Sequence, residues 1–373
     1  MPEQDPINDI VAPEEPVQFE EPVFSFLPQV DGFLWVSQAR NAFGVDGASL
    51  TAAVLDTGLN SKHVDFEGRV LAERNFTTDN GGNPNDATDG NGHGTNVGGI
   101  IVANGDHVGI APGANIIPIK VLKNQGGGSF AGIRDALQWV IENREQYNIS
   151  VVCMSLGNGS NYTDDSSFAK DPLREKIRQL RKDKVAVCIA AGNDFFPHNS
   201  QQGMSYPGIF RECVSVGAVY DAAEGSFSYG NGAKAFSTRK GQITPFSQRL
   251  HPSVNSRTAT DIFAPGAPVT SSGIKGIHGE STQHGTSQAT PVTAGLILLM
   301  QDFYKKVTGE LPEVDDLVKW LRRGGMAIKD GDDEDDNVSH TNLTFIRADA
   351  LSALDTVRRD LHKRLLRSGG VSP

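Results

Sequence analysis

The sequence predicts an α/β fold in which helices cover both faces of a mainly parallel sheet. Short apolar runs with the length of buried strands recur along the chain, and amphipathic runs at helical spacing lie between them. Strands that alternate with helices pair in parallel, because each helix returns the chain to the same end of the sheet. The predicted strands span residues 50–55, 116–121, 150–154, 185–190 and 213–219, and the predicted helices between them span 130–145 and 172–182.

The composition is that of a folded, loop-rich protein. Of the 373 residues, 38% are hydrophobic and 41 are glycine, and the net charge of −11 argues against general nucleic-acid binding. The apolar run at 294–300 is too short to cross a bilayer, so no membrane span is expected. The N-terminus lacks the basic and apolar regions of a secretory signal. This favours a cytoplasmic location, unless a leader has been removed from the chain.

Three segments are expected along the chain. Residues 1–30 hold six prolines and seven acidic residues, so this acidic, proline-rich extension cannot bury enough apolar surface to fold by itself. Residues 31–355 carry the globular pattern, and residues 356–373 form a basic amphipathic tail. The tail helix either docks on the domain or lies on a membrane surface. The helical run at 354–367, which includes most of this tail, has an apolar stripe of Leu354, Val357, Leu361 and Leu365.

Two other features have competing interpretations. Cys153, Cys188 and Cys213 lie in apolar runs and are expected to fill the core, with a cysteine nucleophile as the alternative. Residues 330–336 (DGDDEDD) are expected to form a solvated acidic loop, with ion binding as the alternative. Their spacing lacks the glycine and the final glutamate of an EF-hand calcium loop.

The chemistry is carried by three short motifs: Asp56-Thr57-Gly58, His93-Gly94-Thr95 and Gly285-Thr286-Ser287. A serine hydroxyl is a poor nucleophile until a base within hydrogen-bond reach accepts its proton. We expect His93 to be that base, and Asp56 to orient its ring and stabilise the imidazolium. Each motif alone is common, but the three together, each at the edge of a strand or helix, predict an activated serine.

Two groups are expected to stabilise a developing oxyanion. Ser287 opens a predicted helix over 287–307, so its backbone N–H has no acceptor within the helix and the helix dipole favours negative charge there. Asn193 follows the strand at 185–190, where its side-chain amide can be held rigidly. Asp56, Ser155 and Asn193 all follow predicted strands, and carboxyl ends of parallel strands share one edge of a sheet. The sequence therefore predicts that these residues lie together.

The segments VLDTG (54–58), GHGTNVGG (92–99) and GTSQATPVTAG (285–295) closely resemble the three signatures of the subtilases. The chain order Asp, His, Ser is also that of this family and differs from the chymotrypsin and α/β-hydrolase orders. The segments VLKNQGGGSFAGI, SLGNG, AAGND, SYPG, VSVGAV and FAPG follow in the family's order, so the resemblance covers about residues 25–355. It implies a single three-layer α/β/α domain and a serine endopeptidase that forms an acyl-enzyme. The implied site residues are the triad Asp56, His93 and Ser287, with Asn193 in the oxyanion hole.

The resemblance also implies a cleft in which an extended peptide lies between two strand edges. Phe130 matches the aromatic rim of the pocket for P4, the fourth residue before the scissile bond, and implies an apolar P4 residue. Asp194 falls near the pocket for P1, the residue directly before that bond, where it either favours a basic P1 residue or points to solvent. The other matched residues are Gly126, Gly127 and Gly128 on one edge, Ser155, Leu156 and Gly157 on the other, and Ser205 near the P1 pocket.

The chain departs from the family's usual pattern around the motifs. Asn96 stands where many relatives have histidine, His284 where asparagine is usual, and Gln288 where methionine is usual. His284 is an alternative base, but only His93 has the full motif.

No metal ligand is assigned from the sequence. No cofactor is expected for catalysis, whereas structural calcium is left open. The loop at 102–111 is short compared with relatives that build a tight calcium site there. Asp65, which matches a ligand of that site, is therefore expected to be a solvated or capping acid, and the acidic stretch at 79–89 is another candidate for calcium.

The resemblance suggests a role for the N-terminal extension. Subtilisins of the intracellular type carry short extensions that cover the active site and are trimmed on activation. The apolar segment at 22–28 (PVFSFLP) is a candidate for such a cover, with a plain disordered leader as the alternative.

Besides a protease acting on a protein or peptide substrate, two other functions are open. The first is a catalytically silent fold used for binding, which would be expected to lack one of the four site residues. The second is a peptide ligase, in which an amine rather than water accepts the acyl group. The sequence does not predict an oligomeric state.

Overall fold

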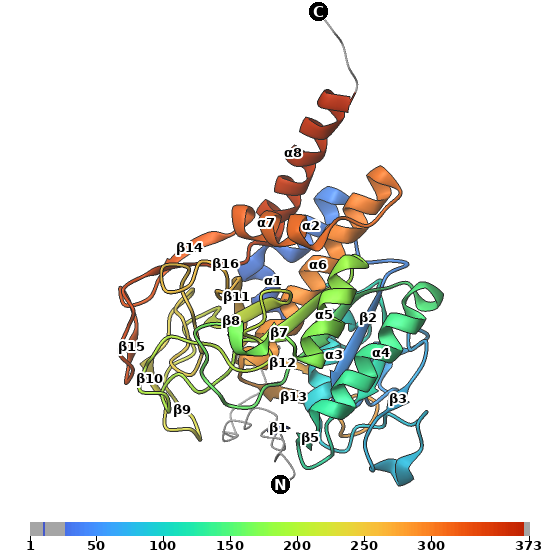
Figure 1. The fold of residues 1–373 in the computed structure, drawn as a ribbon, viewed down its shortest axis with the longest axis horizontal. Coiled ribbons are helices and arrows are strands. Elements are labelled where there is room, and N and C mark those ends of the chain that lie inside the picture. Colours follow the sequence, from blue (N-terminus) through green and yellow to red (C-terminus); the bar gives the residue numbers. More distant parts are fainter. Residues whose placement is uncertain (1–9, 12–26, 369–373) are drawn as a thin grey trace, which may run out of the picture.

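The computed structural model describes residues 10–11 and 27–368, and its centre is a nine-stranded sheet (Figure 1). Neighbouring strands pair in parallel from β3 to β16, and only β14 pairs antiparallel, with β16. All five predicted strands are present, within a few residues of the expected bounds. In sheet order the strands are β14 (Met326–Lys329), β16 (Thr344–Arg347), β11 (Ile262–Ala267), β8 (Val214–Tyr220), β7 (Ala186–Ala190), β6 (Ile149–Met154), β2 (Thr51–Asp56), β4 (Asn115–Lys120) and β3 (Arg74–Asn75).

Helices cover both faces of this sheet and complete the expected three layers. Alternate residues of β2 show the two faces: Ala52 and Val54 belong to one apolar core, and Ala53 and Leu55 to the other. The first core includes α1 (Leu27–Leu34), α2 (Val36–Phe43), α3 (His93–Val102), α6 (Thr286–Thr308), α7 (Val314–Gly324) and α8 (Ala350–Ser368), and the second includes α4 (Phe130–Tyr147) and α5 (Pro172–Lys182).

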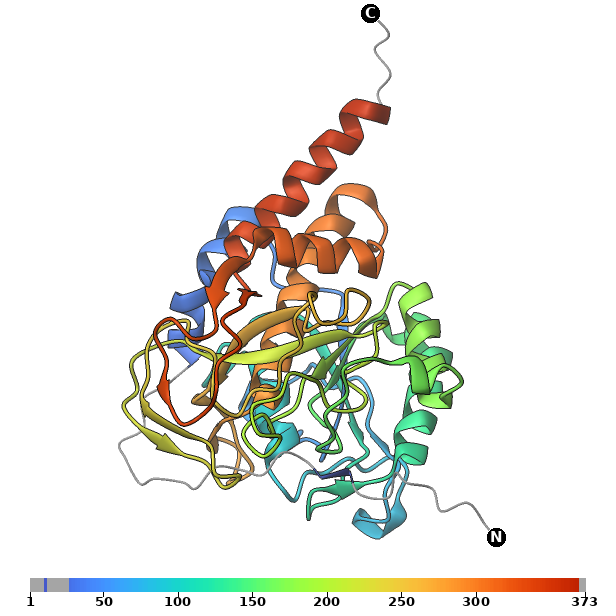
Figure 2. The same cartoon turned by 60° about the vertical axis from the view of Figure 1, so that its left-hand side comes forward.

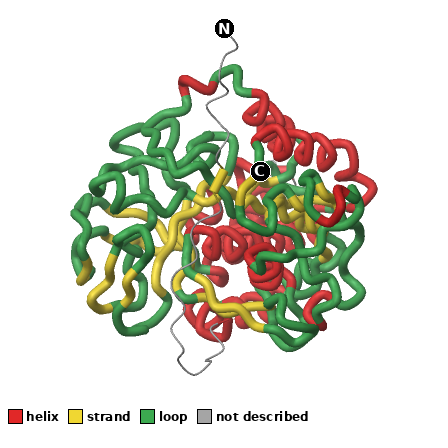
Figure 3. The backbone as a smooth tube through the Cα atoms, turned by 90° about the horizontal axis from the view of Figure 1, so that it is seen from below, coloured by secondary structure: helices red, strands yellow, loops and turns green. Residues whose placement is uncertain are grey.

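The smaller elements lie outside the central sheet. Seen from below, loops make up much of the surface around the strands (Figure 3). Among the described residues, three small sheets join these loops. They pair β1 (Ile10–Val11) with β5 (Gly127–Gly128), β12 (Val269–Ser272) with β13 (Glu280–Gln283), and β10 (Lys234–Ser237) with both β9 (Phe227–Ser228) and β15 (Asp335–Asp336). Three single turns of 3₁₀ helix are η1 (Val64–Phe66), η2 (Asn80–Gly82) and η3 (Ser166–Phe168).

Side-chain caps fix where the two predicted helices begin. The Ser129 side chain accepts a hydrogen bond from the Gly132 N–H at the start of α4. Asp171 accepts from two backbone N–H groups at the start of α5, and Pro172 occupies the first helical position, where no N–H is needed. Both helices therefore begin where a polar side chain replaces the missing backbone acceptors.

The C-terminal helix α8 is docked on the domain along its first part. Leu354, Val357 and Leu361 are buried, and the Trp320 Nε1–H of α7 donates to Asp360 Oδ2 at 3.1 Å. Leu365, the last residue of the predicted stripe, is 59% exposed, and this end of the helix extends away from the body (Figure 2). Of the two interpretations of the tail, the described residues thus show docking. No helix in the described part of the chain is long and apolar enough to span a bilayer.

The segment boundaries stay a prediction, although two helices cross them. Helix α1 begins at Leu27, inside the predicted extension, and α8 runs through the predicted start of the tail at residue 356. Most of the extension, including residues 22–26 of the proposed cover, lies outside the described residues.

The predicted solvated loop at 330–336 is partly wrong. Asp330 is fully buried, and its carboxylate lies 3.2 Å from Arg249 Nε and 3.1 Å from His340 Nδ1. Hydrogen bonds to Asp330 and Asp336 raise the pKa of His340 to about 10, against the opposing effect of burial. The middle of the loop is exposed, but its ends are tied into the domain by these charges.

The three cysteines are buried, as expected of core residues. Burial raises the pKa of each thiol, because it disfavours the charged thiolate. The cysteine-nucleophile alternative therefore has no support in the structure.

Candidate active site

Asp56 and His93 come together at the carboxyl edge of the sheet. Asp56 is the last residue of β2, and His93 is the first residue of α3. Both are buried, and His93 Nδ1 lies 2.7 Å from Asp56 Oδ1, which also accepts the Thr57 N–H at 2.7 Å. Because a carboxylate only accepts, Nδ1 carries the proton in this contact. The other ring nitrogen, Nε2, then has the lone pair that a general base needs.

Asp89 holds the start of α3 in place, and sequence reasoning missed this role. Its Oδ1 accepts the Gly92 N–H at 2.9 Å, and its Oδ2 accepts from both the N–H and the hydroxyl of Thr95. Thr57 links the two motifs, because its hydroxyl donates to Asp89 and accepts the Gly94 N–H at 2.8 Å. The N-cap position itself is Gly92, which has no side chain, so no standard capping pattern in the sequence marks this role of Asp89.

The same contacts argue against calcium in the acidic stretch at 79–89. The oxygens of Asp89 are occupied by the donors just described, and Asp79 accepts the Asn124 N–H and lies 3.7 Å from Lys120 Nζ. Among the described residues, this stretch contributes to no group of three possible metal ligands. Its acids serve as caps and ion-pair partners.

The close contact between the first turn of α3 and the chain that follows β2 requires glycine at position 94. A β-carbon at this position would lie 2.3 Å from the Gly58 carbonyl oxygen, which is far inside van der Waals contact. The glycine therefore allows α3 to start directly against the end of β2, and this close approach brings His93 to Asp56.

Ser287 is fully buried and is the second residue of α6. Its hydroxyl donates to the Ser155 carbonyl at 3.2 Å, and the Ser155 hydroxyl donates to the Ser287 carbonyl at 2.7 Å. That carbonyl is available because Pro291, four residues later, has no N–H to donate to it. The proline thus frees an acceptor that ties the start of α6 to the end of β6.

Asn193 follows β7, and its side-chain orientation is fixed. Its Oδ1 accepts from the Thr286 N–H at 2.9 Å and from the Thr286 hydroxyl at 2.8 Å. The amide nitrogen consequently points away from Thr286, on the side of Gly285, and lies 3.2 Å from the point where a β-carbon of Gly285 would stand. Asn231, which sequence reasoning also missed, donates to the Asn193 carbonyl at 2.6 Å.

Two of the residues that depart from the family pattern, Asn96 and Gln288, connect the helix that carries His93 to the helix that carries Ser287. Gln288 Nε2 donates to Asn96 Oδ1 at 3.3 Å and to Gln283 Oε1 at 3.0 Å, and so links the helix that begins beside Ser287 to the helix that begins with His93. Two of the three departures are thus hydrogen-bond partners of each other.

His284 lies in an aromatic cluster. Its ring is edge-on to Phe227, with centroids 4.8 Å apart, and its Nδ1 lies 3.5 Å from the Tyr229 hydroxyl. Burial lowers the pKa of His284 to about 3, so its imidazole is neutral. Its polar contact is with Tyr229, whereas the Asp56 carboxylate contacts His93.

The residues matched to a substrate cleft lie around this edge. β5, at Gly127–Gly128, pairs antiparallel with β1, at Ile10–Val11. Phe130 is buried and packs edge-to-face on Tyr206, with centroids 4.6 Å apart. Leu156 is fully buried in the core on the α4 side of the sheet, so only its backbone is available to a ligand. Asp194 is half-buried, and its carboxylate lies near Gly159.

Asp65 was expected to be a solvated or a capping acid, and because it is buried the first of these two expectations is wrong. It accepts from the His107 N–H, from His107 Nδ1 at 2.7 Å and from the Ser272 hydroxyl at 2.6 Å. His107 Nε2 faces Glu280 Oε1 at 3.2 Å, so both ring nitrogens face carboxylates and the ring is an imidazolium. Burial alone would lower the pKa of His107, but the two carboxylates outweigh it and raise that pKa.

His63, Asp65 and His107 form a buried group that has the donors for a metal ion. In this arrangement, however, the His63 Nδ1 lone pair accepts the Asp65 N–H, and the positive charge beside Asp65 comes from His107. Burial opposes ionisation of Asp65, yet its hydrogen bonds lower its pKa to about 2. A histidine therefore occupies the position of a counter-ion next to the residue that matches a calcium ligand.

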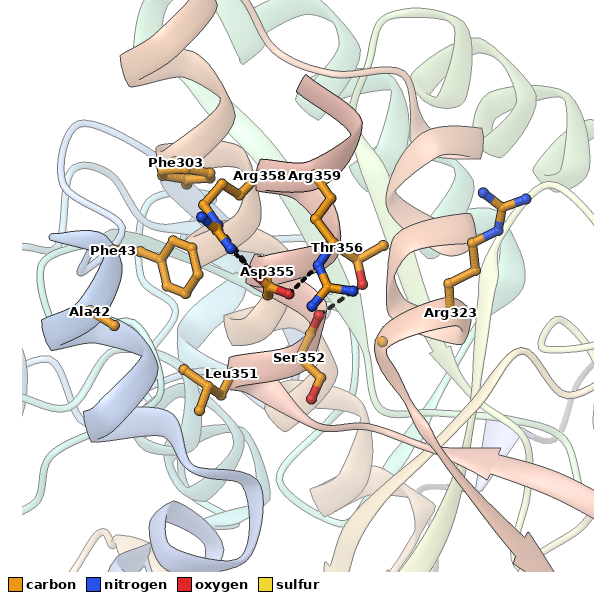
Figure 4. A pocket seen from close by; sticks show the side chains of 11 residues that line it. Ala42, Phe43, Phe303, Arg323, Leu351, Ser352, Asp355, Thr356, Arg358 and Arg359 are labelled. Atoms are coloured by element: carbon orange, nitrogen blue, oxygen red, sulfur yellow. Dashed lines mark hydrogen bonds and ion pairs between the residues drawn. The ribbon is translucent and has the colours of Figure 1, made fainter. Parts of the chain in front are cut away.

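An open hollow lies apart from the three motifs, between α2, α6, α7 and α8 (Figure 4). Phe43 and Phe303 lie on one side of it, and Arg358 and Arg359 both pair with Asp355 at 2.6 Å. These two guanidinium groups therefore already have a carboxylate partner, whereas Arg323 lines the hollow from α7 (Figure 4).

The profile of the subtilase family matches residues 47–321, which is most of the chain. The chain belongs to the subtilase family. An intracellular serine protease of Paenibacillus polymyxa is 32% identical over 259 residues, covering 68% of this chain and 67% of the relative. The major intracellular serine protease of Bacillus subtilis is 30% identical over 266 residues, covering 70% and 71%. Membership and these relatives show that this subtilase is a serine-type endopeptidase.

Proposed function

We propose that this subtilase hydrolyses peptide bonds through an acyl-enzyme on Ser287, with His93 as the general base and Asp56 as its orienting partner. The 2.7 Å contact between His93 Nδ1 and Asp56 Oδ1 is the observation that carries the proposal. In the reaction, His93 Nε2 accepts the Ser287 proton as Oγ attacks the carbonyl carbon, and then passes that proton to the leaving amine. Water, activated by the same nitrogen, releases the acyl group and restores the serine.

The oxyanion of each tetrahedral intermediate would be held by two donors. The Asn193 amide is kept in one orientation by Thr286, and the Ser287 N–H lies in the first turn of α6, where no helical carbonyl precedes it. Fixed donors in a buried site stabilise charge without having to reorganise, which is why we assign the oxyanion hole to this pair.

Hydrolysis is expected to fall as the pH is lowered from about 8 to 5, because a protonated imidazole cannot accept the serine proton. Asp65, whose pKa is about 2, stays ionised over this range and therefore does not contribute to the pH dependence of hydrolysis. The measurement is kcat/KM for a peptide without titrating side chains, with the thermal unfolding midpoint recorded at each pH as a control for folding. A flat profile on folded protein would exclude His93 as the base.

The substrate is proposed to lie extended between Gly126–Gly128 and Ser155–Gly157, with its P4 side chain against Phe130 and its P1 side chain near Asp194 and Ser205. Support comes from the pairing of the chain's own Ile10–Val11 with Gly127–Gly128, since it shows that this edge accepts an antiparallel strand. The segment of the extension that pairs there differs from the one expected at 22–28.

Deleting residues 1–26 is expected to raise the initial rate on a short peptide about tenfold or more. A tethered segment competes at an effective concentration on the order of millimolar, so its removal frees the edge for substrate. A full-length variant with Ile10→Pro and Val11→Pro, which removes strand N–H groups, should give a similar gain. Removal of residues 369–373 is the matched control and should change nothing. Equal rates with and without residues 1–26 would show that the extension does not cover the cleft.

No group other than these side chains and water is needed for the proposed steps, and structural calcium stays a prediction. Two relatives are named as intracellular proteases, and we propose the same location for this chain.

A further inference from the structure

Gln248 is a fully buried residue whose amide nitrogen has hydrogen-bond partners, whereas its amide oxygen has none among the described residues. Its Nε2 donates to the Ser160 carbonyl at 2.9 Å and to Asn161 Oδ1 at 2.8 Å. Because both partners are acceptors, the amide cannot be turned over without placing an oxygen against two oxygens. Its Oε1 is buried and has no hydrogen-bond donor among the described residues.

This unpartnered oxygen lies directly behind Gly192, the residue before Asn193. It is 1.9 Å from the point where a β-carbon of Gly192 would stand, and the Ser205 β-carbon is 2.9 Å from the same point. Gly192 has a φ of +114°, which favours glycine, and a side chain at this position would need the space that the Gln248 oxygen occupies.

Ser205 closes the space between the two edges of the proposed cleft. Its N–H donates to the Ala191 carbonyl on one edge at 2.8 Å, and its hydroxyl accepts the Asn158 N–H at 3.2 Å on the other. A β-carbon on Gly157 would lie 2.7 Å from the Ser205 hydroxyl. Gly157 and Gly192 therefore both face Ser205, and the Gln248 oxygen lies on the same side of Gly192 as Ser205 does.

We propose that Gln248 Oε1 is the hydrogen-bond acceptor at the base of the P1 subsite and that it selects glutamine as the P1 residue. The inference rests on the proposed function, because it assumes that the P1 side chain enters between these two edges. A buried acceptor without a donor is costly, and a P1 amide N–H would supply the missing donor. The Ser205 hydroxyl can pair with the other end of the same amide.

A neutral P1 amide fits the surroundings of the Gln248 oxygen better than a charged P1 side chain does. The neighbours shown here for the Gln248 amide and its oxygen are uncharged: Gly192 and Ser205 on one side, and the Ser160 carbonyl and the Asn161 amide on the other. None of them offers a full charge that would offset burial of an ammonium or a carboxylate. Asp194, the other candidate for P1 recognition, is only half-buried and would favour lysine or arginine. The two possibilities predict different P1 preferences.

The test is kcat/KM for four peptides that differ only at P1, which is glutamine, methionine, lysine or glutamate. Methionine matches glutamine in length and volume but has no N–H, so it measures the hydrogen bond alone. The kcat/KM of the glutamine peptide is expected to exceed that of the methionine peptide about ten- to a hundredfold. Without an amide N–H in the substrate, the Gln248 oxygen stays unpaired. A preference for methionine or for lysine over glutamine would overturn the inference, and the latter would assign P1 selection to Asp194.

Gln248→Met should bring the glutamine-to-methionine ratio to about one. Gln201→Met, which replaces an exposed glutamine of the neighbouring loop, is the matched control and should keep the wild-type ratio. Labelling of Ser287 by a fluorophosphonate separates the two proposals. If Ser287 is labelled but wild-type protein cleaves both peptides equally, the P1 inference fails and the protease stands. If neither peptide nor probe reacts, even after removal of residues 1–26, both fail.

Discussion

Ser287→Ala is expected to lower kcat for peptide hydrolysis by about a millionfold, a size taken from the corresponding loss in subtilisin itself. Without Oγ no acyl-enzyme forms, and the remaining rate comes from binding and the oxyanion donors. The fold should persist, because the change removes one oxygen and its 3.2 Å hydrogen bond to the Ser155 carbonyl.

Single-turnover kinetics and the thermal unfolding midpoint together check this result. Ser256→Ala, at an exposed serine, is the control and should match wild type in both. A folded Ser287→Ala variant with substantial activity would place the nucleophile elsewhere.

Asn193→Ala is expected to lower kcat about a hundred- to a thousandfold with little change in KM, again by analogy with the matching amide in subtilisin. The amide donor acts on charge that exists only in the transition state, so substrate binding is hardly affected.

The aspartate variant separates the catalytic role of Asn193 from a structural one. Asn193→Asp keeps an oxygen for the Thr286 N–H and hydroxyl but removes the amide donor and adds negative charge. If the amide stabilises the oxyanion, the aspartate variant should be at least as slow as the alanine variant. Recovery of activity in the aspartate variant would instead mean that Asn193 only anchors the start of α6.

Much of the sheet could be predicted because its central strands are buried on both faces. β2, β6 and β7 are continuous apolar runs, as parallel strands between helices should be, and their ends locate Asp56, Ser155 and Asn193. The strands that were missed do not have this pattern. β11 contains Pro265 and Gly266, and β14 is an edge strand that is mostly exposed.

The groups that position the site were harder to predict, because their partners come from distant parts of the chain. Asp89 lies outside the N-cap position of α3, which is Gly92, so no standard capping pattern marks it. Asn231 holds Asn193 from a separate loop, and nothing near it in the sequence indicates this contact. Asp65 was expected to be a solvated or capping acid because the loop at 102–111 is short, and nothing near Asp65 in the sequence indicates that His107 supplies its counter-charge. The burial of Asp330 was not predicted for the same reason, because its partner Arg249 lies far away in the chain.

The departures from the family pattern illustrate the same limit. Asn96 and Gln288 each look like an isolated exchange in the sequence, whereas the structure shows them hydrogen-bonded to each other across α3 and α6. Residue types alone do not reveal such pairs, because complementarity depends on which side chains the fold brings together.

Labelling with a fluorophosphonate, read by intact mass and peptide mapping, decides whether Ser287 is the activated nucleophile. We expect one adduct, on Ser287, that forms faster once residues 1–26 are removed and is absent from Ser287→Ala. An adduct on another residue, or none on either the full-length or the shortened protein, would contradict the proposed mechanism and favour a catalytically silent fold.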